Sequence, residues 1–320
     1  MIAALLLVSF AILISAVGHA ALAQPWATRT PRVAILGWQA LSTSVVTSML
    51  LAAIALALPF LPLRFSLASL LGAHAITVVE HYETPLGVVP GVVGLLLVTV
   101  VAGMLATTTT RNFTRTRRIR RAQLDSLQLV GAAHPDGFTV IDHDVPVAYC
   151  LPGRGTGTVV LSSAALALLD ERERALVLGH ERQHLRARHD LALAYSAALH
   201  RTFPWLPLFA TAHREIAVLL EMAADDSATS AADRRALARA IVALGTGVRP
   251  ETALAASDTA AVLRVRRLVS TVPSTSLRSR ALAGAVVAFV MTAPIGLALA
   301  PAAEAATSGC CSATEFSLRP

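Results

Sequence analysis

The sequence predicts a membrane-embedded bundle of four α-helices with an α+β domain inserted before the fourth helix. Hydrophobic residues make up 55% of the 320 residues, charged residues make up 15%, and mean hydropathy is +0.62. A typical soluble domain has about 25% charged residues, so this composition excludes an ordinary soluble protein. All 27 basic residues are Arg, and most of the charge lies in one segment between Arg111 and Arg280. Only 3 cysteines are present, which excludes a disulfide-rich secreted scaffold.

Four stretches without charged side chains are long enough to cross the hydrocarbon core, which takes about 20 apolar residues. They are residues 2–22, 33–63, 86–106 and 281–303. Residues 65–79 are also apolar but too few to cross, so we expect them at the interface or packed on the bundle. The expected organisation is three spans in 1–110, the inserted domain in 111–280, the fourth span in 281–303 and a short extracytoplasmic tail in 304–320.

The first apolar stretch has two interpretations. Ala21-Leu22-Ala23 before Gln24 resembles a signal-peptidase site. A signal peptide, however, has a positively charged start and an apolar core of about 7–15 residues, and this stretch has neither feature. The arginines that follow it favour a retained span whose second end lies in the cytoplasm.

Arginine beside the spans predicts the orientation, because positive charge accumulates on the cytoplasmic side. Arginines lie between the first two spans, directly after the third span and directly before the fourth. We therefore expect a multi-pass plasma-membrane protein with both termini outside and the inserted domain in the cytoplasm. The cluster between Arg111 and Arg121 also fits nucleic-acid binding, but its place after a span favours anionic membrane lipid as the partner, without direct nucleic-acid contact.

The inserted segment has strand patterns followed by helical patterns. Strands are expected at 138–142, 145–150 and 158–162, and helices at 163–169, 170–200, 210–230 and 233–244. Asp170 followed three residues later by Glu173 is a capping-box pattern, which marks the start of the first long helix. The segment is therefore expected to form a small α+β domain.

The sequence HERQH, which begins at His180, lies on this long helix and matches the pattern HExxH. Residues four apart share a helix face, so His180 and His184 can bind one zinc ion at about 2.0–2.1 Å. Glu181 is then placed to accept a proton from the attacking water. The alternative is a polar helix face with unrelated histidines, since the chain has 10. The strand and apolar residues that precede the motif favour the zinc site.

A catalytic zinc ion needs a third protein ligand, and the pattern HExxHxxGxxH with a third histidine is absent. We expect Glu221, in the sequence EMAAD, to be this ligand, because Ala223 and Ala224 allow its helix to approach the first closely. Asp225 lies one turn beyond Glu221 and is expected to hold the second nitrogen of a ligating imidazole. The alternative is an ordinary acidic helix face, because Asp226 is also present.

HERQH followed by EMAAD, between the third and fourth spans, resembles the BlaR/MecR membrane metallopeptidases, the antirepressor signal transducers of antibiotic resistance. The runs VAYCLPG, TVVLSSAALALL and FPWLP are similar to that family as well. The resemblance implies a gluzincin-like HExxH zinc endopeptidase with Zn²⁺ as its cofactor. It also implies that the enzyme cuts a cytoplasmic BlaI-like winged-helix repressor in a transmembrane signalling response, and that it can cut itself.

One departure from that family concerns the signal. Its antibiotic-sensing members carry a penicillin-binding domain after the fourth span, whereas few residues follow Ala303 here, and a chain without Lys has no Ser-x-x-Lys motif. We therefore expect an unidentified extracytoplasmic or membrane sensor partner. Two other functions stay open: a quality-control or processing zinc protease like the HtpX and CAAX-processing enzymes, and a non-enzymatic signalling scaffold. The intact base Glu181 argues against the scaffold.

The cysteines give little information. Cys310 and Cys311 form an adjacent pair outside any disulfide framework, which favours the absence of a role. The alternatives are binding of a soft metal ion and pairing with a partner protein. Cys150 ends a predicted strand and is expected to be a buried filler of the core.

Overall fold

The computed structural model describes residues 1–320 except 72–73, 83–86, 154–156, 246–253, 271–275 and 309–320. The chain divides into two compact units. The first comprises Met1–Gln24, Leu36–Thr107 and Leu277–Pro320, and the second comprises Pro25–Ile35 and Thr108–Ser276. Cys310 and Cys311 lie outside the described residues.

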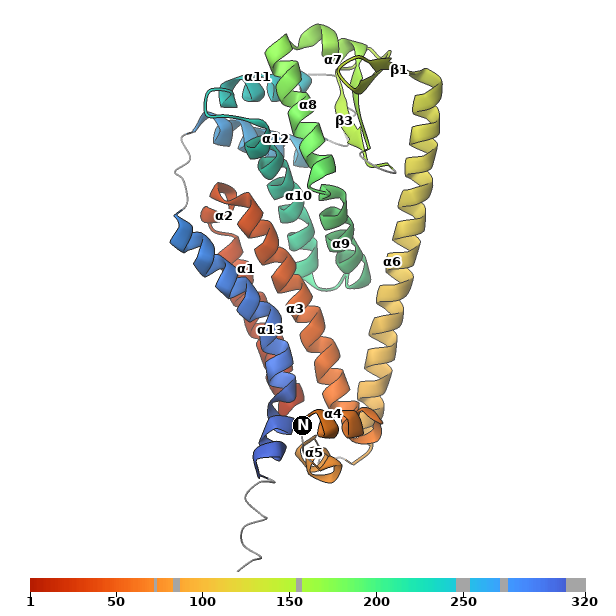
Figure 1. The fold of residues 1–320 in the computed structure, drawn as a ribbon, viewed down its shortest axis with the longest axis vertical. Coiled ribbons are helices and arrows are strands. Elements are labelled where there is room, and N and C mark those ends of the chain that lie inside the picture. Colours follow the sequence, from red (N-terminus) through yellow and green to blue (C-terminus); the bar gives the residue numbers. More distant parts are fainter. Residues whose placement is uncertain (72–73, 83–86, 154–156, 246–253, 271–275, 309–320) are drawn as a thin grey trace, which may run out of the picture. The chain divides into compact units, whose positions relative to one another are not determined.

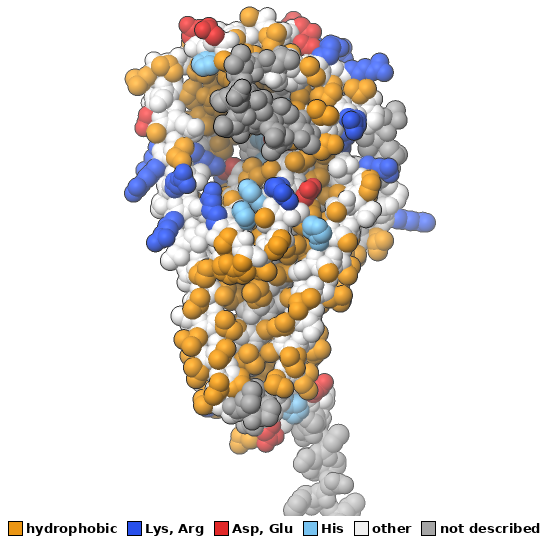
Figure 2. All heavy atoms as spheres, turned by 180° about the vertical axis from the view of Figure 1, so that it is seen from behind, with side chains coloured by type: hydrophobic (Ala, Val, Ile, Leu, Met, Phe, Trp, Pro, Cys, Tyr) orange, Lys and Arg blue, Asp and Glu red, His pale blue; other side chains and the backbone are white. Residues whose placement is uncertain are grey.

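The predicted apolar helices are present in the described part of the chain. Four helices are long and apolar enough to cross a membrane. They belong to α1 (Ile2–Leu22), α3 (Pro31–Ala57), α6 (Val89–Val130) and α13 (Leu277–Ser308). Many large hydrophobic side chains on these helices are exposed, and Figure 2 shows how widely they cover the surface. Such surfaces fit lipid as the surrounding solvent.

Helix α13 shows how the first unit tolerates a proline inside a span. Pro294 has no N–H, so the carbonyl group of Val290 loses its usual partner within the helix. The hydroxyl group of Ser44 on α3 donates a hydrogen bond to this carbonyl at 2.7 Å. A neighbouring helix therefore satisfies the polar group that proline leaves free, as an apolar environment requires.

The apolar stretch at 65–79 forms helices too short to span a bilayer. A short 3-10 helix, η1 (Leu58–Phe60), precedes α4 (Leu63–Leu71) and α5 (Ala75–Tyr82). The hydroxyl group of Tyr82 donates a hydrogen bond to the carbonyl group of Ala298 on α13 at 2.6 Å. This segment therefore packs on the other helices of the first unit.

Helix α6 is longer than the predicted third span. It continues from the apolar stretch through the arginine cluster to Val130 without a break. No proline or glycine interrupts residues 104–130, so nothing in the backbone ends the helix earlier. The second half of α6, from Thr108, belongs to the second unit.

The second unit contains a four-stranded sheet in the order β1-β2-β4-β3. The strands are β1 (Gly131–His134), β2 (Phe138–Ile141), β3 (Ala148–Leu151) and β4 (Thr158–Ser162). Strands β2 and β4 are parallel, and the other two pairs are antiparallel. Strand β1 was not predicted. It pairs with β2 through a tight turn in which Gly137 has a φ of 77°, a conformation that favours glycine.

The helices of the second unit follow the sheet. They are α7 (Ser163–Leu168), α8 (Glu171–Arg186), α9 (His189–Thr202), α10 (Pro207–Ala228), α11 (Arg234–Gly245) and α12 (Leu254–Val269). The predicted capping box of Asp170 and Glu173 is confirmed at the start of α8. The prediction of one helix over 170–200 is wrong. Arg188 adopts a left-handed conformation (φ 52°, ψ 44°) that ends α8 and starts α9.

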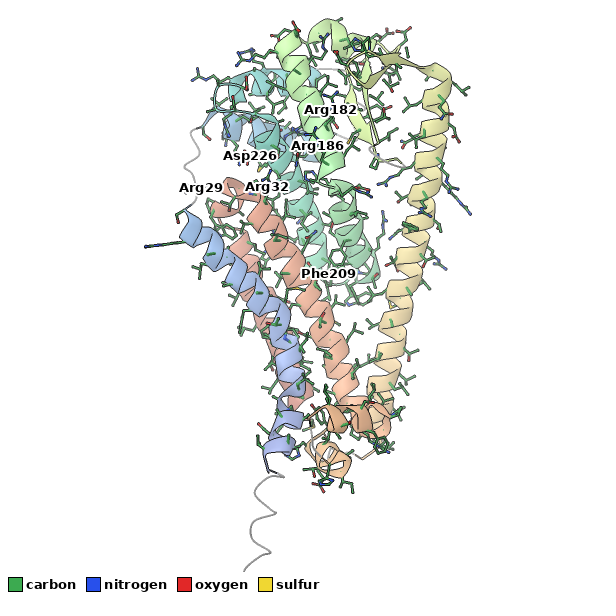
Figure 3. All side chains as sticks on the ribbon, viewed as in Figure 1. Arg29, Arg32, Arg182, Arg186, Phe209 and Asp226 are labelled. Carbon is green, nitrogen blue, oxygen red and sulfur yellow. The ribbon has the colours of Figure 1, made fainter. Side chains whose placement is uncertain are left out.

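A short helix, α2 (Trp26–Arg29), lies in the connection between α1 and α3. This connection belongs to the second unit. Arg267 on α12 donates a hydrogen bond to the carbonyl group of Thr28 at 2.6 Å and pairs with both oxygens of Asp226 on α10 at 2.8 and 2.6 Å. Arg32 donates a hydrogen bond to the hydroxyl group of Ser227 at 2.7 Å. Figure 3 labels Arg32 and also Asp226, the residue before Ser227. The α1–α3 connection is thereby held against the end of α10.

Candidate metal centre

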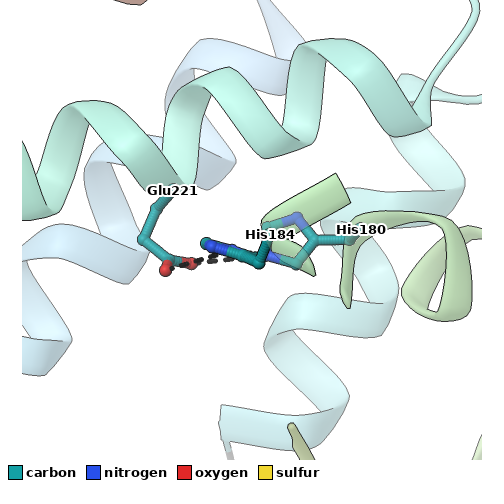
Figure 4. A group of neighbouring side chains, drawn as sticks. All are labelled: His180, His184 and Glu221. Carbon is teal, nitrogen blue, oxygen red and sulfur yellow. Dashed lines mark hydrogen bonds and ion pairs between the residues drawn. The ribbon is translucent and has the colours of Figure 1, made fainter. Parts of the chain in front are cut away.

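Two helices of the second unit bring the three predicted ligands together. His180 and His184 lie one turn apart on α8, with their Nε2 atoms 3.1 Å apart. The carboxylate of Glu221 on α10 lies 3.4 Å from each of these Nε2 atoms (Figure 4). Their ligand atoms all lie within 4.8 Å of one another, so one metal ion can contact all three residues.

Small residues allow α8 and α10 to approach. Ala223 and Ala224 are fully buried on α10, next to the glutamate they help to position. On the other helix, Gly179 directly precedes His180 and faces Ala228; a methyl group there would lie at an ordinary contact distance of 3.7 Å, so small residues in general, and not glycine in particular, suit this position. The sequence argument from the alanines therefore agrees with the packing.

Each histidine has a neighbour at its second nitrogen. Asp225, which is 1% exposed, has its Oδ1 atom 3.0 Å from Nδ1 of His180, in the place that the sequence predicted. The Nδ1 atom of the buried His189 lies 2.9 Å from Nδ1 of His184. His189 was not predicted. It is the first residue of α9, so the break at Arg188 places it beside the motif.

Arg264 on α12 is a second residue that the sequence argument missed. Its Nε and Nη2 atoms donate hydrogen bonds to both oxygens of Asp225 at 2.9 and 2.7 Å. Its Nη1 atom lies 2.9 Å from Oε2 of Glu221. One largely buried guanidinium therefore compensates the charge of both carboxylates. Because α12 was not predicted, no sequence signal connected this arginine with the motif.

A cavity of about 570 Å³ adjoins the cluster. His180, His184 and Glu221 line one part of it, with Glu181 beside them. Strand β3, which is an edge strand of the sheet, lines another part with its residues 148–150. The predicted base, the predicted ligands and a strand edge therefore face a common space.

Cys150 was expected to be a buried core filler. It packs against a hydrophobic cluster of the sheet, but it is only partly buried and also lines this cavity. Burial and the nearby charge of Glu181 raise the pKa of the Cys150 thiol to about 12. The side chain is therefore a neutral thiol at physiological pH. It adds a weakly polar wall next to the base.

Comparison with protein families gives one match in this chain. The sequence model of peptidase family M48 matches residues 113–286. This range includes the end of α6 and all of the cluster. The match covers more than half of the 320 residues. The chain belongs to peptidase family M48. No curated protein and no solved structure matches the chain.

Family M48 consists of zinc metallopeptidases, so the predicted enzyme class is confirmed. The cluster fits such a metal ion by its donor atoms. Two imidazole Nε2 atoms and a carboxylate oxygen converge, while the Nδ1 atoms face Asp225 and His189. Catalytic zinc sites commonly have three protein ligands of these types and an open position. His180, His184 and Glu221 would therefore hold the zinc ion of this M48 peptidase.

The electrostatics of the cluster favour a bound cation. Burial alone would lower the pKa of His180, but its contacts with Asp225 and Glu221 outweigh burial and raise this pKa to about 9. Burial alone would raise the pKa of Glu221, but His180 and Arg264 lower it to about 2. Burial lowers the pKa of His184 to about 4, which keeps this imidazole neutral. His180 would release its proton when a metal ion binds, because a ligating imidazole must be neutral.

Proposed function

We propose that this M48 peptidase is an integral-membrane zinc endopeptidase of the BlaR/MecR type, which cleaves a cytoplasmic BlaI-like repressor in a transmembrane signalling response. The observation that carries the peptidase assignment is the convergence of His180, His184 and Glu221 on a cavity shared with Glu181. The four apolar helices support the membrane location.

The zinc ion supplies Lewis-acid polarisation of the scissile carbonyl group when it is bound. Glu181 is the general base: it accepts a proton from the attacking water and then gives a proton to the leaving amine nitrogen. Burial raises the pKa of Glu181, which suits a carboxylate that takes up a proton. Asp225 and His189 hold the two imidazoles in orientation.

The substrate is a peptide in an extended conformation. Among the described residues, strand β3 pairs only with β4, so its second edge can pair with another strand. Residues 148–150 of this strand line the cavity beside the cluster. A substrate segment can add to such an edge through backbone hydrogen bonds, which are independent of side-chain identity. This binding mode requires a flexible substrate segment, such as a linker between two domains of a repressor.

The contacts of α2 support a signalling role. The connection between α1 and α3 contacts Ser227 on α10 directly through Arg32. It reaches Asp226 indirectly, because the carbonyl group of Thr28 accepts a hydrogen bond from Arg267, which pairs with Asp226. A movement of these apolar helices would reach α10 through the contacts of Arg32 and Arg267. A sensor partner in the membrane could therefore act on the metal centre.

A second candidate is a quality-control or processing protease like the HtpX and CAAX-processing enzymes. Membership of family M48 is equally consistent with this function. The two candidates differ in substrate, since a quality-control protease cuts diverse membrane proteins and an antirepressor cuts one soluble regulator.

The test is co-expression of the full chain with a BlaI-like winged-helix repressor and a reporter under that repressor's operator. Wild-type protein should shorten the repressor and raise transcription from its operator, whereas Glu181→Gln should do neither. Mass spectrometry of the repressor locates the cut. A repressor that stays intact while other membrane proteins are cut would move the assignment to quality control.

A further inference from the structure

The hairpin of α9 and α10 ends in an apolar tip, residues 203–207, which we call the hairpin tip. Phe203 and Phe209 are buried with ring centroids 5.4 Å apart, and they form its base. Trp205 meets Phe203 edge-on at 5.8 Å and remains 61% exposed. Figure 3 places Phe209 at this end of α10. A large indole therefore projects from a packed aromatic base.

The backbone of the hairpin tip is suited to surroundings with little water. Pro204 and Pro207 have no N–H group. The N–H groups of Phe203 and Leu206 donate hydrogen bonds to the carbonyl groups of Leu199 and Phe203 at 2.9 and 3.1 Å. Unpaired N–H groups are costly in an apolar medium. In the hairpin tip, two positions have no N–H group and two others have a hydrogen-bonded one.

Two contacts align α9 with the second half of α6. Asp190, near the start of α9, pairs with Arg120 at 3.0 Å. Arg201, near its end, donates a hydrogen bond to Asn112 at 2.7 Å. The two helices are therefore antiparallel, and the hairpin tip extends beyond Asn112 in the direction of Thr108.

The sequence of α6 indicates where the hairpin tip lies relative to a membrane. Its charge-free stretch ends at Thr110, and Arg111 is the first of the clustered arginines. The hairpin tip is therefore level with the transition from apolar to cationic residues. In a helix that enters a bilayer, this transition lies at the boundary between the acyl chains and the headgroups.

The neighbouring side chains fit the same boundary. Phe113 is 55% exposed and lies under the guanidinium of Arg117, with 4.2 Å to the ring centroid. Arg111 and Arg115 on α6 and Arg214 on α10 are exposed as well. Aromatic rings gather at membrane interfaces, and arginines there contact lipid phosphates.

We propose that the hairpin tip is a membrane anchor, with Trp205 seated at the boundary of headgroups and acyl chains. The partner is the lipid surface of the bilayer that α6 enters, enriched in anionic lipid around the arginines. Helix α10 starts in the anchor and carries Glu221 about 21 Å further along, at 1.5 Å per residue. The anchor therefore fixes the distance between the metal centre and the membrane.

The test uses the full chain with Trp26→Phe and Trp38→Phe, which leaves Trp205 as its only tryptophan. The protein is reconstituted into vesicles of phosphatidylcholine and phosphatidylglycerol, with or without bromine on the acyl chains. Brominated lipid should quench the emission of Trp205. A matched control carries Trp205→Phe and Leu168→Trp on α7, and its emission should be unaffected. Position 168 is comparably exposed, at 46%, and is the last residue of α7, which lies outside the α9–α10 hairpin.

Equal emission of Trp205 in both kinds of vesicle overturns the anchor. A blue-shifted but unquenched emission also overturns it, because protein, such as a second copy of the chain, then covers the tip. If the tryptophan substitutions prevent folding, a nitroxide on Trp205→Cys, with the three native cysteines replaced, gives a second measurement. It should collide more often with oxygen than with a water-soluble nickel chelate. Neither readout depends on proteolysis, so failure of the anchor is separate from failure of the proposed enzyme activity.

Discussion

Arg264 and Asp225 form a bidentate ion pair next to the metal centre, with hydrogen bonds of 2.9 and 2.7 Å. Asp225 in turn lies 3.0 Å from Nδ1 of His180. The orientation of the first ligand therefore depends on a residue of α12, more than eighty positions later in the chain. Such a chain of buried charges is stable only when every member is paired.

Removing Arg264 should therefore destabilise the metal-free protein more than the zinc-bound protein. Arg264→Leu leaves the buried carboxylate of Asp225 and the partly exposed carboxylate of Glu221 without their cation. Breaking a buried pair such as Arg264–Asp225 costs about 3–5 kcal/mol. Added zinc should restore much of the loss, because the metal compensates Glu221. Thermal unfolding with and without zinc measures the difference, and Arg264→Lys should lie between wild type and Arg264→Leu. Equal destabilisation in both conditions would show that the arginine acts only through packing.

His189 should contribute to zinc affinity without touching the metal. His189→Ala removes the neighbour of Nδ1 on His184, and changes to such orienting partners typically cost about 10–100-fold in affinity. Competition with a fluorescent zinc chelator measures this loss. His189→Asn, which can still form a hydrogen bond, should lose less. His200→Ala, on the other end of α9, is the control, and a loss as large as that of His189→Ala would argue against the orienting role.

Substitutions of the predicted ligands and of the predicted base should have different effects on the zinc content of the protein. His184→Ala and Glu221→Ala should lose zinc, because two remaining ligands hold it poorly. Glu181→Gln should keep zinc and lose proteolysis, because its carboxylate accepts a proton and binds no metal. A chelator should abolish the wild-type activity, and zinc should restore it. Full zinc content in Glu221→Ala would place the third ligand elsewhere.

Local spacing predicted the part of the site that lies on two helices. His180, Glu181 and His184 follow from the helical period, and Glu221 with Asp225 follows from the same period on α10. His189 and Arg264 could not be found in this way. The first depends on the left-handed turn at Arg188, a residue type that gives no turn signal. The second depends on tertiary packing of α12, because nothing in the spacing of an arginine says which carboxylate it meets.

The membrane helices were easier to predict than the sheet. Long apolar stretches are visible in composition alone, and the structure has them. Strand β1 was missed because GAAH shows neither β-branched residues nor alternation, and it pairs through its neighbour β2. The extent of α6 was missed because the change from apolar to charged residues marks a change of solvent and not the end of a helix.

The topology should follow from the packing of α2. Residues 25–35 belong to the same compact unit as Thr108–Ser276, so both should lie on the same side of the membrane. A reporter fused after Arg121 should therefore read cytoplasmic, and one fused after Ser308 should read outside. Labelling of an engineered cysteine at Arg29, in whole cells and after permeabilisation, checks the α1–α3 connection. Labelling in intact cells would place this connection outside and contradict the orientation.

The proposed anchor predicts a minimum distance between a membrane span of a substrate and its cleavage site. Helix α10 rises about 21 Å from Pro207 to Glu221 at 1.5 Å per residue if it stands upright. An extended chain covers about 3.3–3.6 Å per residue, so a membrane-anchored substrate needs about six linker residues to reach the cluster, and fewer if α10 is tilted. In reconstituted vesicles, a series of substrates with one span, a variable linker and the same cleavage sequence should therefore show a threshold in cleavage rate. A soluble peptide with that sequence should be cut regardless of linker length, which controls for the chemistry. Equal cleavage at every linker length would show that the metal centre is not held at a fixed height above the bilayer.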